Sequence, residues 1–456
     1  MDAWTLELTV GDLLLDISIL GALLLLGTVL RRQVRFFQRY MVPNSLIAGF
    51  MGLFLGSELF NVLPLDPERM GAYVYHLLAV TFIGIGLYPT SSRHTTGAVH
   101  LGFMQVSIML IQGIVGVGIA LAATWLVLPD LNPAMGLLLP LGFAMGPGIA
   151  YSVGQSWSAF GYEDGGNAGL SIAAIGFLVA YFLGMYLING TRAHAADPAL
   201  LDSGFLPATD RPVGSRLSFS GAAIEPLAVH VALVGGIYCL TYLLVSSLAV
   251  LLTLAGLSQE IPVLWSFHFI LANLMAVGMR RLVLRGWAGD WIDEGMVRRM
   301  TGTFADYLIT ASIVGISLSV SWDFVAPILA ISAGGTLATY LFLKLVVRRV
   351  FGAHVLERFI AMFAQMTGTI SSGLALLRVT DPEYRTPVAE ELVLASGMAL
   401  GMGFPLLLAI NMPFSLFDGS TPGFLILSGV LLVYLAVLLV CWNRFARTNP
   451  GTHTPE

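Results

Sequence analysis

Residues 143–152 read FAMGPGIAYS and interrupt an apolar run that extends over about 134–162. A similar interruption, FAQMTGTISS, occupies residues 363–372 within a second apolar run over about 354–383. Glycine, proline and small polar residues break a helix, and non-helical backbone at membrane depth is tolerated only where it lines a cavity or is buried in protein. We interpret each run as a re-entrant hairpin that enters a membrane and returns.

The composition around these runs is that of a membrane protein. Hydrophobic residues make up 57% of the 456 positions and charged residues 11%, whereas a soluble domain carries about 25% charged residues. A helix needs about 20 residues to cross a bilayer, and the long apolar runs lack the alternating polarity of barrel strands. The sequence therefore predicts an all-α polytopic membrane protein.

We predict about eleven transmembrane helices and derive their direction from the basic residues. Arginine and lysine follow the first, third, fifth, seventh, ninth and last spans, so these loops share one side. Because basic loops stay in the cytoplasm, we expect a multi-pass protein of the cell inner membrane with its N-terminus outside and its C-terminus cytoplasmic. The predicted spans lie at about 10–30, 43–64, 72–90, 101–128, 165–190, 223–255, 262–279, 304–320, 324–347, 387–412 and 422–443.

Matching features recur in the same order in the two halves of the chain. Pro43 opens the second span of one half and Pro262 opens that of the other, and IGIGL at 83–87 corresponds to VGISL at 314–318. An odd number of crossings per half inverts the second repeat, and inverted repeats with broken helices are typical of secondary transporters. We divide the chain into an N-terminal repeat (1–190), a cytoplasmic linker (191–221), a C-terminal repeat (222–412) and an extra helix with the tail (413–456).

These stretches resemble the bacterial sodium/glutamate symporter family, which is akin to the 2-hydroxycarboxylate transporters. The resemblance covers roughly residues 10–412 and lies in Tyr40-Met41-Val42-Pro43, the 83–87 run, Gly146-Pro147-Gly148 and the stretch from Gly368 through Leu374. It implies a two-domain inverted-repeat fold, two re-entrant loops that meet near the midplane, a homodimer, and import of L-glutamate coupled to sodium. The chain departs from the family in the few glycines of the second tip and in the last span.

The residues at the two hairpin tips are the candidate substrate site. A half-helix that starts at mid-membrane presents free N–H groups and the positive end of its dipole to a carboxylate, and unwound carbonyl and hydroxyl oxygens suit sodium. Alternatively, the small residues serve close helix packing, and the arginine extends to the membrane interface. The candidates are Gly146, Gly148, Ser152, Thr367, Gly368, Thr369, Ser371, Ser372 and Arg378.

Asp306, Asn167 and Asn273 are the candidate ion-binding residues. An acid within a span is a functional candidate, either as a cation ligand or as a proton carrier. The alternative for Asp306 is an interfacial residue at a helix start, where acids are favoured. The alternative for the two asparagines is hydrogen bonding between helices.

The predicted function is sodium-coupled symport of L-glutamate or a related carboxylate by alternating access. A proton-coupled or export carrier for another organic anion is the alternative. We expect no cofactor, no metal beyond the sodium ion, and no nucleic-acid partner, because the chain has no basic tract. An intramembrane enzyme needs paired acids, a metal constellation or a nucleophile with its base. The sequence shows none of these patterns, and we assign no catalytic residue.

Overall fold

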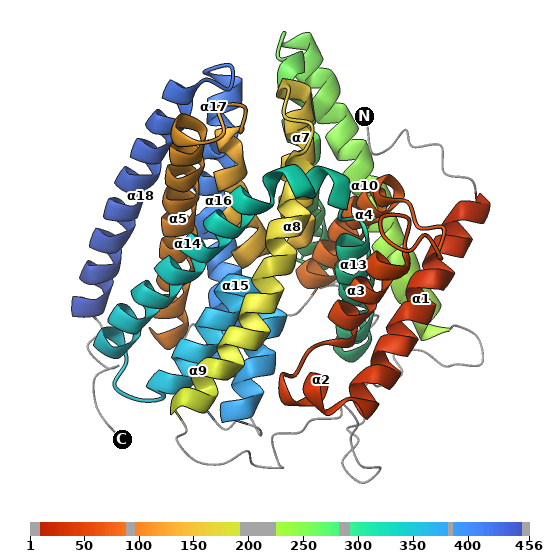
Figure 1. Ribbon diagram of the computed structural model, residues 1–456, viewed down its shortest axis with the longest axis horizontal. Coiled ribbons are helices and arrows are strands. Elements are labelled where there is room, and N and C mark those ends of the chain that lie inside the picture. Colours follow the sequence, from red (N-terminus) through yellow and green to blue (C-terminus); the bar gives the residue numbers. More distant parts are fainter. Residues whose placement is uncertain (1–9, 88–95, 192–224, 282–291, 382–385, 449–456) are drawn as a thin grey trace. The chain divides into compact units, whose positions relative to one another are not determined.

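The computed structural model describes residues 10–87, 96–191, 225–281, 292–381 and 386–448. Within these ranges the chain forms helices and no strand, and nine helices are long and apolar enough to cross a membrane (Figure 1). This confirms the prediction of an all-α polytopic membrane protein. The nine are α1 (Val10–Gln33), α4 (Pro67–Leu87), α5 (Thr96–Leu126), α8 (Gly165–Leu178) continued by η4 (Val179–Leu183) and α9 (Gly184–Thr191), α10 (Pro226–Leu254), α14 (Leu318–Val350), α15 (Val355–Thr380), α16 (Val388–Ala409) and α18 (Thr421–Thr448).

Two of the predicted spans are shorter than expected. The span at 43–64 contains the 12-residue helix α3 (Asn44–Leu55). The span at 262–279 is divided at Phe267 into α11 (Ile261–Ser266) and α12 (His268–Met279). A helix of 12 residues is about 18 Å long, which is well below the thickness of a hydrocarbon core. In both places the apolar stretch of sequence is therefore longer than the helix that it forms.

Two further segments differ from the prediction. The span at 304–320 is the second part of α13 (Glu294–Val314), whose first turns carry charged residues, so the helix as a whole is less apolar than a span. Conversely, α15 covers most of the expected hairpin at 354–383 and has the length and hydropathy of a span. Its backbone is nevertheless non-helical at Gly368 and Thr369.

The helices form two compact units, which we describe separately. Unit 1 contains α1, α3, α4 and α10 to α13. Within it α13 packs along α4 and α3, and glycines permit the close approach, because Gly49 of α3 lies against Ile313 of α13. The Asp16 carboxylate of α1 is buried and pairs with Arg69 of α4 at 2.8 Å, and Tyr73 donates to the same carboxylate at 3.0 Å. These contacts fasten α1 to α4.

Unit 2 contains α2 (Arg35–Arg39), α5 to α9, and α14 to α18, with α17 at Met412–Ser415. Helix α5 packs against α14, α16 and α18, and the long helix α18 lies along α5 (Figure 1). Trp442 of α18 donates to Nδ1 of His100 on α5 at 2.8 Å. The predicted extra helix is thus attached to this unit by a buried hydrogen bond as well as by apolar contacts.

The two units do not coincide with the two halves of the sequence. Unit 1 takes segments on both sides of the predicted linker, and so does unit 2. The linker at 191–221 lies almost wholly outside the described residues. Each compact unit is therefore built jointly by both predicted repeats.

Candidate functional site

The first backbone interruption of unit 2 lies at Gly146. The π-helical turn η2 (Leu141–Met145) ends there, and α7 (Pro147–Ser156) begins directly after it. Gly146 has φ 96 and ψ 171, a conformation that L side chains rarely adopt. Pro147 then takes the first helical position, where its missing N–H costs no hydrogen bond. The local sequence thus ends one helix and starts another within two residues, and we call this point the first break.

The segment that contains the first break starts and finishes at the same end of unit 2. Its beginning lies beside the end of α5, where Thr124 donates to the Leu131 carbonyl at 2.9 Å. It finishes at the start of α8. There the Asn167 side chain makes two hydrogen bonds to the backbone of Ser317, the residue before α14. Helices α5 and α14 are antiparallel, since Gly334 lies against Ile119 and Thr339, further along α14, accepts a hydrogen bond from Gln112, which lies earlier in α5. The end of α5 therefore lies at the same end of unit 2 as the start of α14.

The second interruption lies at Gly368 and Thr369 inside α15. A Cβ atom added to Gly373 would lie 2.8 Å from the carbonyl oxygen of Ala361. In a straight helix these two residues would be about 18 Å apart along the axis. The chain therefore folds back at Gly368 and Thr369, which we call the second break, and the two lengths of α15 pack against one another.

Thr369 has φ 75 and ψ 167. This region of backbone conformation is essentially restricted to glycine, and a β-branched residue there is a strained outlier. Such strain persists only where the surrounding structure determines it, and it gathers at ligand sites. The backbone conformation of Thr369 therefore makes it a stronger candidate for substrate binding than its residue type alone did.

The two breaks meet inside unit 2. A Cβ atom at Gly146 would lie 2.9 Å from Cγ2 of Thr369. The segments around them also touch: Gly176 of α8 contacts both the Thr367 carbonyl and the ring of Phe143. Two interruptions from opposite halves of the sequence thus occupy one place.

Two helix N-termini face this place. Helix α7 starts at Pro147 without a side-chain cap, and the second length of α15 starts after Thr369. Free N–H groups and the positive ends of two helix dipoles favour an anion such as a carboxylate. The helices that end at the two breaks contribute carbonyl oxygens, which suit a hard cation. The place where the breaks meet therefore has helix N-termini that suit an anion and carbonyl oxygens that suit a cation.

The predicted substrate residues differ in how close they lie to the two breaks. Gly146, Gly368 and Thr369 form the breaks, and Thr367 and Gly148 directly adjoin them. Ser372 is buried and donates to the Gly368 carbonyl, with Tyr181 Oη 3.1 Å away.

The remaining three substrate candidates lie further along their helices. Ser152 is buried in α7, and Ser371 is exposed. Arg378 is exposed and stands nine residues after Thr369, or about 13 Å along the helix axis. This distance favours the interfacial alternative for Arg378.

The three ion-binding candidates are not brought together. Asn167 in unit 2 uses both ends of its amide on Ser317: Nδ2 donates to the carbonyl at 3.0 Å, and Oδ1 accepts from the N–H at 2.7 Å. Asn273 in unit 1 donates to the Phe82 carbonyl at 2.9 Å. Both asparagines therefore fit the alternative of hydrogen bonding between segments. Asp306 lies in α13 of unit 1, and its carbonyl accepts a hydrogen bond from Thr310 Oγ1 at 2.8 Å.

Gln112 is a residue of the site that we did not predict. Its side chain is fully buried on α5, and its Nε2 donates to the Met366 carbonyl and to Thr339 Oγ1, each at 2.9 Å. Met366 stands just before the second break, so Gln112 supports the end of the first length of α15. A glutamine inside an apolar span was the signal in the sequence, because a buried polar group requires partners.

Replacing Gln112 with leucine should weaken the support of the second break. The Met366 carbonyl would lose its donor, and an unsatisfied buried group costs about 1–3 kcal/mol. We expect a lower melting temperature in detergent together with slower uptake of the transported ligand. Gln105→Leu is the matched control on the same helix, because its Nε2 contacts only the weakly accepting Met362 sulfur at 4.0 Å. Equal losses in both variants would contradict the role of Gln112.

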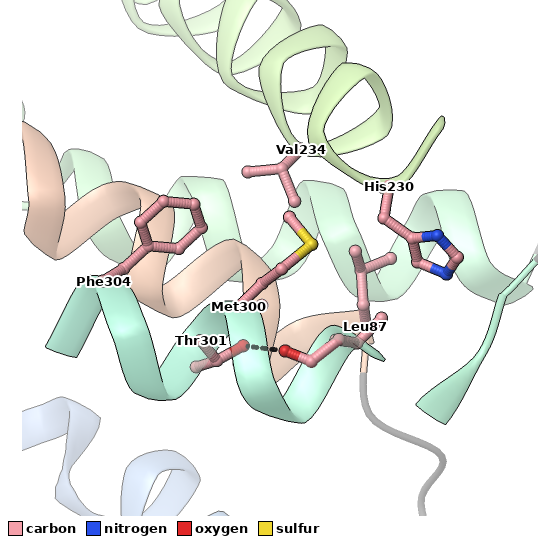
Figure 2. Close-up of a pocket in the computed structure, with 8 residues that line it drawn as sticks. Leu87, His230, Val234, Met300, Thr301 and Phe304 are labelled. Atoms are coloured by element: carbon pink, nitrogen blue, oxygen red, sulfur yellow. Dashed lines mark hydrogen bonds between the residues drawn. The ribbon is translucent and has the colours of Figure 1, made fainter. Parts of the chain in front are cut away.

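A separate hollow in unit 1 is apolar and too small for a ligand. Figure 2 shows Leu87, Val234, Met300 and Phe304 around it. It has no space that a water molecule could occupy. The Thr301 hydroxyl at its edge donates to its own helix, to the Val297 carbonyl at 2.7 Å. We assign this hollow to helix packing.

No protein-family model, curated protein or solved structure matches the chain. Its class therefore follows from its own fold and composition. The chain is a polytopic all-α membrane protein, and one of its compact units holds two broken helical segments whose breaks are in contact.

Proposed function

We propose that the chain is a secondary carrier that imports L-glutamate or a related carboxylate together with sodium. It would act by alternating access in the cytoplasmic membrane, as a homodimer and without catalytic chemistry. The resemblance to the sodium/glutamate symporter family supports the substrate and the ion, and the polytopic helical fold fits a transporter in general.

The contact between the two breaks carries this proposal. Gly146 and Thr369 lie side by side within an apolar helical unit. Non-helical backbone at membrane depth is tolerated only where it is buried in protein or lines a cavity. In secondary transporters, half-helix N-termini bind anionic substrate groups, while unwound carbonyls bind the coupling ion. We infer that both segments are re-entrant and that the place where they meet binds the substrate.

The proposed mechanism uses each part of the site for one task. The N–H groups after Gly146 and after Thr369 would hold the substrate carboxylate, because both helix ends are positive there. Carbonyl oxygens before the breaks would hold sodium. Since each ion neutralises the other, the loaded site would cross the low-dielectric region at a lower electrostatic cost than a half-loaded one. This difference couples the two fluxes.

One observation favours the alternative, a proton-coupled carrier or exporter for another organic anion. Asp306 lies in a helix of unit 1 without an ion pair among the described residues. Intramembrane acids of this kind often carry protons in transporters. The two possibilities differ in the ion that drives the flux, and one assay distinguishes them.

Uptake of labelled L-glutamate into proteoliposomes tests the proposal. We expect accumulation under an inward sodium gradient and its loss when choline replaces sodium. Accumulation that needs a proton gradient but no sodium would support the alternative. If no member of a panel of carboxylates accumulates under either gradient, the carrier proposal fails.

A further inference from the structure

The C-terminal ends of α14 and α18 meet beside the start of α5. The ring of Phe351, the residue after α14, has its centroid 5.8 Å from that of the His100 ring on α5. Phe445, in the last turn of α18, lies 5.3 Å from the same His100 ring. All three helices belong to unit 2, and Figure 1 shows the lower ends of α14 and α18 next to each other. One imidazole ring thus joins two helix ends that are far apart in the sequence.

Five basic side chains lie on these two helix ends, within the last two turns of each helix. All five are exposed, and none of them forms an ion pair with a described acid. We call this group the basic patch, and its members are Lys344, Arg348 and Arg349 of α14 and Arg444 and Arg447 of α18.

The acids at this end of unit 2 do not neutralise the basic patch. Glu391, in the first turn of α16, is buried and pairs with Arg358 of α15 at 2.9 Å. Its carboxylate lies against Gly97 at the start of α5, so it belongs to the same end of the unit. The other described acids at the ends of α15 and α16 are fewer than the five cations, so the patch keeps a net positive charge. They are Glu357, Asp381 and Glu390.

Exposed apolar surface leads up to the basic patch on both helices. On α14, Leu341 and Leu345 are exposed and share a helix face with Arg348, because four and three residues separate them. On α18, the exposed Val440 stands one turn before Arg444. Both helices are long and apolar enough to span a membrane, so these faces are suited to acyl chains. The cations that follow them are then at the level of the lipid headgroups.

We propose that the basic patch binds the headgroup of an anionic phospholipid. Arginine forks bind phosphate oxygens through paired, charge-assisted hydrogen bonds, and the acyl chains of the same lipid would lie along the exposed leucine and valine side chains. Basic sites between transmembrane helices at one membrane surface bind such headgroups. This lipid site is independent of which substrate the protein transports.

A free phosphate fits the same cations less well than a lipid does. Its charge would be held only by exposed side chains, whose interactions water and salt screen. A phospholipid adds apolar contact with two helices. A headgroup shared by both helix ends would also tie α14 to α18, in addition to their common contact with His100. Binding of the lipid should therefore raise the melting temperature of the protein.

Thermal unfolding of the purified, delipidated protein in a neutral detergent tests the proposal. We expect added phosphatidylglycerol to raise the melting temperature, whereas zwitterionic phosphatidylcholine and inorganic phosphate leave it nearly unchanged. The double variant Arg348→Gln with Arg444→Gln should melt like the wild type without lipid, because both side chains are exposed. In this variant the concentration of phosphatidylglycerol that gives half of the shift should rise on the order of tenfold.

Arg39→Gln with Arg299→Gln is the matched control, because it removes two exposed arginines from other helices, α2 and α13. Its response to phosphatidylglycerol should equal that of the wild type. An equal loss in both double variants would show that only net charge matters, and would overturn the site. If Arg348→Gln with Arg444→Gln does not fold, Arg349→Gln with Arg447→Gln makes the same test.

The two other additives distinguish the remaining explanations. A shift of equal size with phosphatidylcholine would assign the effect to acyl chains alone, and one with inorganic phosphate would assign it to a free anion. Either result, or the absence of any shift with phosphatidylglycerol, contradicts the proposal. None of these measurements involves uptake, so the lipid site and the proposed carrier function stand or fail separately.

Discussion

Gly146→Val should reduce uptake of the transported carboxylate to background while the protein still inserts and elutes as a single species. The valine would have to adopt φ 96, and its Cβ would lie 2.9 Å from Thr369 Cγ2. Its two further methyl groups would fill the place where the two breaks meet. The backbone strain costs about 1–3 kcal/mol, and the overpacking costs about 1–3 kcal/mol more. Both N-termini that are proposed to hold the carboxylate would move apart.

Gly161→Val is the matched control for this prediction. Gly161 also has a positive φ, 85, but a Cβ atom there would have no neighbour within 4 Å. Its ψ of 11 places it in the left-handed helical region, so a valine there is also strained, but without the contact at the breaks. Uptake should remain in this variant after correction for the amount of folded protein. If both variants lost uptake alike, backbone strain alone would explain the loss, and the contact between the breaks would have no special role.

Gly116→Val should prevent assembly of unit 2 and give a protein that aggregates on extraction. Gly116 of α5 lies directly against the backbone of Gly136, in the turn η1 (Pro133–Leu137) that leads to the first break. A side chain there meets main-chain atoms that cannot rotate away. Overpacking of this kind costs about 1–3 kcal/mol and occasionally more. The loss should appear as a lowered melting temperature and a reduced yield of monodisperse protein in detergent.

Gly118→Val tests whether the effect belongs to the contact or to the helix. Gly118 lies two residues further along α5, and a Cβ atom there would have no neighbour within 4 Å. The same substitution in the same helix should leave yield and melting temperature nearly unchanged. A similar loss in the two variants would show that valine in α5, not the contact with Gly136, is responsible.

The positions of both breaks could be predicted from the sequence, because their causes are local. Gly146 followed by Pro147 cannot continue a helix, and Gly368 interrupts an otherwise apolar run. The strain at Thr369 could not be predicted, since threonine by itself avoids a positive φ. The packing of the folded unit holds it in that conformation.

Gln112 shows why much of the candidate site could not be predicted. Gln112 stands in a different span from the break that it supports, and its partner is a backbone carbonyl of Met366. The chemistry of a buried polar side chain shows that it needs a hydrogen-bond partner, but the packing of distant segments determines which group that partner is. For Asn167, that choice is the backbone of Ser317 and not an ion.

The sequence by itself determined that this is an all-α membrane protein and where its apolar segments break, because hydropathy, glycine and proline act over a few neighbouring residues. The tertiary structure decided that the two breaks touch and that each compact unit combines both halves of the chain. These outcomes depend on contacts between segments distant in sequence. Their geometry follows from how whole helices pack, which no local pattern specifies.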